Sequence, residues 1–137
     1  KKVKALARSV GEPEPTTPGE LVRSCLEGLA AAYARTIDQI ERITGRTIAT
    51  IHLVGGGVKN ALLNQMTADA TARRVLAGPS EATAMGNVMV QMMAAGEVSG
   101  LAQARDVIRK SCQSAEYSPN REARWARLVG PGLETTR

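Results

Sequence analysis

Apolar residues recur along the chain with two different spacings, and the change between them predicts its elements. From Thr17 to Gly45 they recur every three or four residues, which predicts an amphipathic helix of about 25 residues. Thr17, Pro18 and Glu20 form a helix-start signature, and Gly45 follows the last turn. We expect most of this long helix to lie across a sheet.

Strand, turn and helix signals follow one another directly after this helix. A β-branched run predicts a strand over residues 48–54, and the triple glycine Gly55–Gly57 predicts a tight turn. A helix over 60–72 and a second short strand over 73–77 come next. The near-continuous apolar character of the first strand indicates a central, parallel strand that is covered on both faces. The helix is expected to turn four side chains inward: Leu62, Leu63, Met66 and Ala70.

The second half of the chain is patterned more weakly. A helix over residues 81–95 with Ser80 as its N-cap and another over 101–111 are predicted. Gly86 inside the first of these indicates close approach of a backbone or a ligand, because a glycine costs a helix about 1 kcal/mol relative to alanine. A short helix over 121–129 would turn Trp125 and Leu128 inward.

The pattern predicts one domain that is flanked by a linker and a tail. Three prolines and two glycines between residues 11 and 19 exclude a helix there, so residues 1–19 are expected to be a linker. Residues 20–129 form the domain, and 130–137 form a frayed tail.

The net charge of +5 is concentrated at the two ends, and the middle of the chain is slightly acidic. We interpret the basic ends as solvated termini, since no motif accompanies them and the chain has three aromatic residues. No nucleic-acid partner is therefore expected.

Cysteine and histidine are too few for a structural zinc site. Cys25 and Cys112 are far apart and His52 is the only histidine, which favours a reduced, cytoplasmic protein with no bound structural metal. His52 is expected to be a hydrogen-bonded structural residue. No apolar run approaches the roughly 18–20 residues that span a bilayer, so no membrane association is expected.

The triple glycine is the main candidate for chemistry. Backbone N–H groups without Cβ atoms, placed before a helix, favour an anion, but a bare turn would have the same sequence. Lys59 is followed by Asn60 rather than Ser or Thr, which excludes a Walker loop. The third glycine and the acidic strand end of a dinucleotide fingerprint are also absent. Turn and binding site both remain open on spacing alone.

The residues after the turn carry a more specific signal. Asn60 follows the second glycine by four residues, Gln65 and Asp69 lie on the next helix, and a Glu-Ala-x-x-x-Gly-Asn run begins at Glu81. In this order the residues resemble the C-terminal half of the FGGY family of sugar kinases, over roughly residues 15–125. The resemblance implies an α/β fold, part of an actin-like (ribonuclease H-like) ATPase domain with long helices packed on a small sheet.

The resemblance also implies a site and a cofactor. Gly55, Gly56 and Gly57 would contact ATP through their backbone, and Asn60 would make a polar contact to adenosine. Many family members have Asp-Gly-Gly where this chain has Val54-Gly55-Gly56, which favours the branch of the family that phosphorylates L-rhamnulose at its 1-hydroxyl. That reaction uses ATP and Mg²⁺.

Three further residues are candidates for roles near the turn. Asp69 is expected to bond to neighbouring groups rather than to Mg²⁺, and Glu81 to sit in the first turn of its helix. Lys59 fits a phosphate contact and a solvated lysine about equally well.

The catalytic base of the family is missing from the chain. By the resemblance, an aspartate in a Gly-x-His-Asp-Thr-like motif takes the hydroxyl proton, and Asp38, Asp69 and Asp106 lack that neighbourhood. We expect a piece of a larger kinase, inactive alone, with no catalytic residue and no metal ligand. The ketose would bind through an upstream domain, and the apolar surface of the cut face would allow self-association.

Two other functions stay open at this point. A degenerate dinucleotide-binding βαβ unit would bind NAD. A non-enzymatic interaction module would bind a partner through its basic ends, with an affinity that falls with salt and ignores Gly56.

Overall fold

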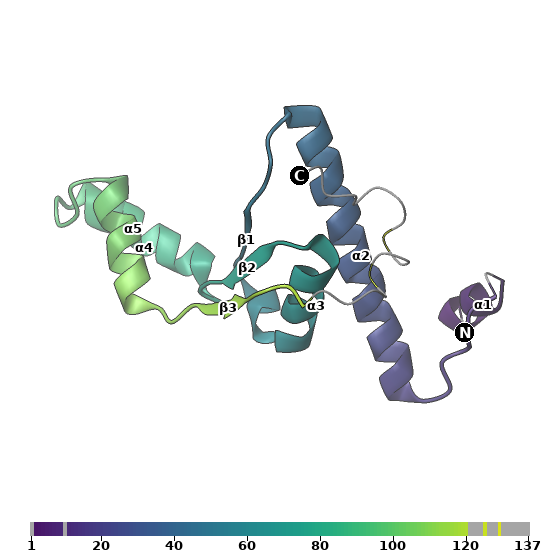
Figure 1. Ribbon diagram of the computed structural model, residues 1–137. Coiled ribbons are helices and arrows are strands. Elements are labelled where there is room, and N and C mark those ends of the chain that lie inside the picture. The colour runs from purple at the N-terminus through teal and green to yellow at the C-terminus, as the bar shows by residue number, and fades with distance from the viewer. Residues whose placement is uncertain (1, 10, 121–124, 126–128, 130–137) are drawn as a thin grey trace.

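The computed structural model describes residues 2–9, 11–120, 125 and 129. Figure 1 shows a small sheet with α2 and α3 to one side of its strands and α4 and α5 to the other. The elements, in order, are α1 (Lys2–Ser9), α2 (Pro18–Thr44), β1 (Thr50–Leu53), the 3₁₀ turn η1 (Gly56–Lys59), α3 (Ala61–Thr71), β2 (Arg74–Ala77), α4 (Ala82–Ala94), α5 (Leu101–Ser111) and β3 (Ala115–Tyr117). The expected α/β class is confirmed.

Helix α2 begins and ends where its sequence predicts. Thr17 and Glu20 form a reciprocal capping box, and Gly45 ends the helix in the left-handed region at φ 65°. The buried face carries Ala30, Ala31 and Ala34, which let another helix approach closely. The expectation that α2 lies across the sheet is wrong, because α2 packs mainly against α3.

The sheet has the order β1-β2-β3, with β1 and β2 parallel and β2 and β3 antiparallel. The central strand is therefore β2, whose Val75 is fully buried. The expected central strand over residues 48–54 is wrong in two respects. The strand covers only Thr50–Leu53, and among the described residues β1 pairs on one side alone, so it is half-buried. His52 is exposed, without the hydrogen bond expected of it within the described ranges.

Helix α3 is buried through polar as well as apolar residues. Met66 and Ala70 point inward as expected, but Leu62 is 49% exposed, so its predicted inward position is wrong. Thr67 and Thr71 take up buried positions instead, because their hydroxyls donate to carbonyls one turn earlier in the same helix, each at 2.7 Å. A polar side chain that is satisfied within its own helix can be buried at little cost.

The start of α4 and the surroundings of Gly86 differ from expectation. The helix begins at Ala82 with Glu81 in the N-cap position, where the Glu81 carbonyl accepts from the Met85 N–H, so Ser80 is not the N-cap. A Cβ added at Gly86 would meet no atom within 4 Å, so no backbone of the described residues approaches it closely, and the alternative of a ligand there stays a prediction. Within α4, Met89 is the buried residue.

Two elements at the ends of the chain have no counterpart in the sequence prediction. Helix α1 forms from strong helix formers although it buries no side chain, and residues 11–17 are non-helical as expected. Strand β3 lies in a stretch without clear periodicity. Trp125 is buried as predicted, whereas Leu128, most of the expected helix 121–129 and the expected tail 130–137 lie outside the described residues. Every helix within the described ranges is too short or too polar to span a bilayer.

Candidate functional site

The glycine turn lies where two parallel strands end. Strands β1 and β2 are in register with Leu53 opposite Ala77, so the loops that follow them emerge at one edge of the sheet. Two backbone hydrogen bonds join these loops: the Gly78 N–H donates to the Leu53 carbonyl at 2.8 Å, and the Gly55 N–H donates to the Pro79 carbonyl at 3.1 Å. The turn is therefore fixed to the neighbouring loop at its first residue.

The three glycines have different conformational roles. Gly55 has φ 84° and ψ −167°, a backbone conformation that side chains rarely allow, so this position requires glycine. Gly56 and Gly57 lie in the 3₁₀ turn without a positive φ, and a Cβ on either would meet nothing within 4 Å. Neither the backbone nor the packing of the described residues explains glycine at 56 and 57.

The backbone N–H groups of the three glycines differ in whether they already have an acceptor. The Gly55 N–H is bonded to Pro79, so the expectation of three donors for an anion is wrong at this residue. The N–H groups of Gly56 and Gly57 have no acceptor among the described residues. Two adjacent donors are therefore left for a group outside the turn.

Asn60 connects the turn to the next helix. Its side-chain Oδ1 accepts from the Leu63 N–H at 3.0 Å, which caps α3. Because the cap occupies this oxygen, the amide NH₂ is the part of Asn60 that can face a ligand. The four predicted site residues, Gly55, Gly56, Gly57 and Asn60, thus lie in one continuous turn.

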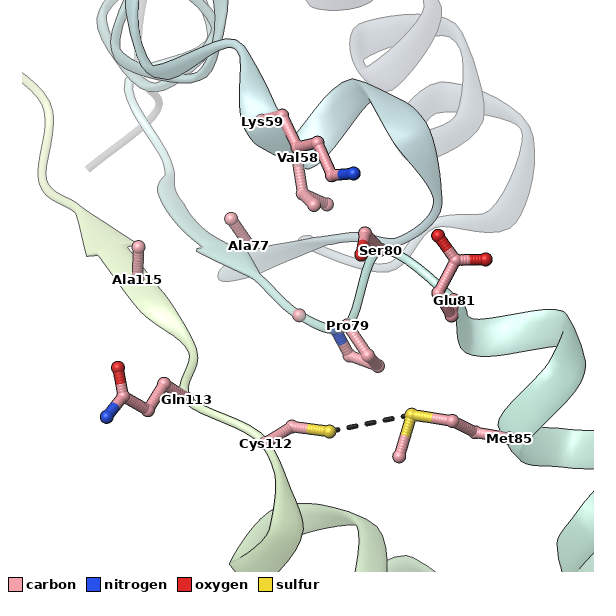
Figure 2. A pocket seen from close by; sticks show the side chains of 11 residues that line it. Val58, Lys59, Ala77, Pro79, Ser80, Glu81, Met85, Cys112, Gln113 and Ala115 are labelled. Atoms are coloured by element: carbon pink, nitrogen blue, oxygen red, sulfur yellow. Dashed lines mark hydrogen bonds between the residues drawn. The ribbon is translucent and has the colours of Figure 1, made fainter.

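A pocket of about 450 Å³ opens beside the turn. Figure 2 shows the side chains that line it, which come from η1, from the loop after β2, from the start of α4 and from the segment between α5 and β3. The lining residues are Val58, Lys59, Ala77, Gly78, Pro79, Ser80, Glu81, Met85, Cys112, Gln113 and Ala115. None of the four predicted site residues lines this pocket, which adjoins the turn through Val58 and Lys59.

The sequence analysis did not predict one part of the pocket wall. Cys112 and Gln113 reach it because β3 pairs with β2, and no sequence signal indicated that strand. The Cys112 Sγ lies 3.5 Å from the Met85 Sδ, as the dashed line in Figure 2 marks, so these two side chains close one side of the pocket. Both cysteines are free thiols.

Asp69 has a structural environment, as expected. It is 8% exposed, and its carboxylate accepts from the Asn120 N–H at 2.7 Å and from the Gln65 side-chain amide at 2.8 Å. Gln65 also donates to the Ser118 carbonyl. The pair fastens residues 118–120 to α3. The described residues contain no group of three or more His, Cys, Asp or Glu side chains that could hold a metal ion.

The carboxyl groups with a shifted pKa lie away from the turn. Backbone N–H groups of Thr16 and Thr17 lower the pKa of Glu20 at the start of α2. The backbone N–H of Ile48 and the Arg73 guanidinium lower the pKa of Glu41, which lies at the other end of the strands. Neither group serves the candidate site. The turn itself offers backbone donors, and the ionisable side chains that line the adjoining pocket are Lys59, Glu81 and Cys112.

Comparison with known proteins assigns the class to which this arrangement belongs. Residues 3–95 match the C-terminal domain of the FGGY family of carbohydrate kinases. The chain therefore belongs to the FGGY family of carbohydrate kinases.

The relatives it matches share one particular name. The chain is 42% identical to a rhamnulokinase of Bacteroides thetaiotaomicron over 123 residues, which cover 90% of this chain and 25% of that protein. It is 37% identical to a rhamnulokinase of Klebsiella pneumoniae strain 342 (93% and 26% covered) and 41% identical to that of Bacillus subtilis strain 168 (87% and 24% covered). The chain thus spans about a quarter of the length of the curated relatives it matches.

Proposed function

We propose that this chain forms the ATP-binding part of a kinase that transfers the γ-phosphoryl group of ATP to the 1-hydroxyl of L-rhamnulose. The observation that carries the proposal is the pair Gly56 and Gly57. Neither N–H group has an acceptor among the described residues, both positions have open space at Cβ, and both lie beside a pocket in a chain of the FGGY family. Glycines that the described structure itself does not require suit the close approach of a phosphate or ribose.

The residues fit the nucleotide better than they fit a metal ion. The turn would offer its N–H groups to the phosphates, the Asn60 amide would reach the adenosine, and the adjoining pocket has a size suited to an organic group. ATP supplies the phosphoryl group for transfer. We assign Mg²⁺ to no residue, because the described part of the chain has no cluster of metal-binding side chains.

We further propose that the chain has no activity alone. Phosphoryl transfer depends on positioning the acceptor and stabilising charge, and sugar kinases need a base for the hydroxyl proton. All three aspartates are occupied elsewhere: Asp38 pairs with Arg42, Asp106 pairs with Arg109 and Lys110, and Asp69 holds the 118–120 segment. None of them lies in the glycine turn.

Calorimetric titration with ADP tests the binding proposal. We expect weak binding to the 137-residue chain, with a Kd of about 1 mM, and a further weakening of about tenfold in Gly56→Ala, because the added methyl group occupies the approach to the turn. Gly28→Ala is the matched control: Gly28 also has open space around it, but it lies on α2, so this variant should bind ADP like the parent chain.

Several outcomes would contradict the proposal. Absence of ADP binding, or equal affinity in Gly56→Ala and the parent chain, would remove the nucleotide from the turn. Binding of NAD in preference to ADP would support the dinucleotide alternative. Formation of L-rhamnulose 1-phosphate from ATP, Mg²⁺ and L-rhamnulose by the chain alone would show that it is active.

A further inference from the structure

Asn64 is a buried polar residue in the first turn of α3, next to the candidate site. Asn64 is 1% exposed, and its side-chain Nδ2 donates to the backbone carbonyl of Val58 at 2.9 Å. Burying an amide costs free energy that a hydrogen bond only offsets, so an apolar side chain of similar size would serve the core at least as well. The polar group therefore calls for a role beyond filling space.

The turn that Asn64 contacts has little other support. Within Gly55–Lys59, the Val58 N–H donates to the Gly55 carbonyl at 3.2 Å, and the Asn60 N–H donates to the Gly57 carbonyl at 3.1 Å. Bonds of this 3₁₀ type have poor geometry, and glycines lose more conformational freedom than other residues when they are ordered. Among the described residues, Asn64 is the one side chain that hydrogen-bonds to the backbone of Gly55–Lys59.

We propose that Asn64 is a positioning residue, which acts through the Val58 carbonyl and touches no nucleotide itself. Its bond holds the far side of the turn onto α3, while the Gly55–Pro79 bond holds the near side. With both sides fixed, Gly56 and Gly57 keep one arrangement before a ligand arrives, which reduces the entropy lost on binding. The expected effect on nucleotide binding rests on the proposed function, whereas the hold of Asn64 on the turn rests on geometry alone.

Two substitutions on the same helix separate positioning from packing. Asn64→Leu keeps the branching and the number of heavy atoms of the side chain, with two methyl groups in place of the amide, and removes the donor to Val58. Thr67→Val is the matched control: Thr67 is equally buried one turn later, and its hydroxyl donates to the Leu63 carbonyl at 2.7 Å inside α3. Both variants lose one side-chain hydrogen bond, but only the first loses its hold on the turn.

The first measurement is amide hydrogen exchange in the nucleotide-free 137-residue chain. In Asn64→Leu the Val58 and Asn60 amides should exchange about tenfold faster relative to the amides of α2, since their local opening no longer breaks the side-chain bond. In Thr67→Val the exchange rates of these two amides should change no more than those of the α2 amides. Equal behaviour of the turn amides in the two variants would overturn the proposal.

The second measurement is the Kd for ADP by calorimetry. We expect it to rise about fivefold to tenfold in Asn64→Leu and to stay unchanged in Thr67→Val. Faster exchange without weaker binding would show that the turn is held but that ADP does not use this order, which also overturns the inference. If the parent chain does not bind ADP, the proposed function fails, and hydrogen exchange still decides whether Asn64 holds the turn.

Discussion

The two helix pairs, α2 with α3 and α4 with α5, are packed to different degrees. On one side, α2 and α3 bury a tight cluster in which every member is at most 3% exposed: Ala30, Ala34, Met66, Ala70 and Trp125. On the other side, α4 and α5 bury Met89, Val98 and Ala104 and otherwise rely on half-buried residues. Val90 and Leu101 are 60% and 58% exposed there. Figure 1 shows the two helix pairs apart, with the strands between them.

This difference locates the candidate site at a boundary. The glycine turn is part of the well-packed side, since Asn60 caps α3 and Asn64 bonds to Val58. The opposite wall of the pocket comes from the loosely packed side, through Met85 and Cys112. A fixed turn facing a more open wall is an arrangement in which one side orders the donors and the other can adjust to a ligand.

Truncating one buried methionine on each side gives the largest expected effect. Met66→Ala should reduce the free energy of unfolding by about 3–5 kcal/mol, because the surrounding helices cannot close the cavity. Met89→Ala should cost about 2 kcal/mol or less, because its half-buried neighbours can move inward. Urea unfolding followed by Trp125 fluorescence measures both. A larger loss in Met89→Ala would reverse the comparison.

The ion pairs of the two sides should respond differently to pH. Glu41 on α2 is 20% exposed and bonds to the Ile48 N–H and to Arg73, which fastens the helix to the start of β2. These contacts lower its pKa below the usual 4.5, so their contribution is present above about pH 4.5 and is lost as pH falls through the lowered value. Within the part of the chain that the structure describes, Asp106 pairs with two neighbours on α5 alone, and it is 42% exposed.

Neutralising each carboxylate separates these two cases. Glu41→Gln, whose amide oxygen can still accept from Ile48, should lower the free energy of unfolding at pH 7 by about 1–3 kcal/mol. The difference from the parent chain should shrink toward zero at pH values below the lowered pKa of Glu41. Asp106→Asn should change the free energy by less than about 0.5 kcal/mol at either pH. Unfolding curves that keep the Glu41→Gln difference at low pH would rule out this charge effect.

Local signals explain which elements were predictable. Helix α2 was, because Thr17, Glu20 and Gly45 specify its ends within a few residues. Strand β3 was not, because a three-residue strand has no periodicity of its own, and the segment after it is bonded to Asp69 and Gln65 on α3, over 50 residues away in sequence. The edge position that β1 has among the described strands could not be predicted either. An apolar run indicates burial, but it does not say which strands pair with it.

The candidate site, like the fold, was predictable from the sequence only in part. The continuity of Gly55 to Asn60 followed from sequence neighbours. The bond from the Gly55 N–H to Pro79, the hold of Asn64 on Val58 and the contribution of Cys112 to the pocket all depend on contacts between separate segments. A sequence motif therefore located the turn, and the tertiary structure determined which of its N–H groups have no acceptor among the described residues.

The chemical shifts of the backbone amides during ADP titration test the central claim most directly. If the free donors of the turn receive the nucleotide, the amide signals of Gly56 and Gly57 should move with ADP concentration. Signals of α1, which Figure 1 shows far from the turn, should stay in place. Stationary Gly56 and Gly57 signals at several millimolar ADP, or shifts confined to other segments, would contradict the assignment of this turn to ATP.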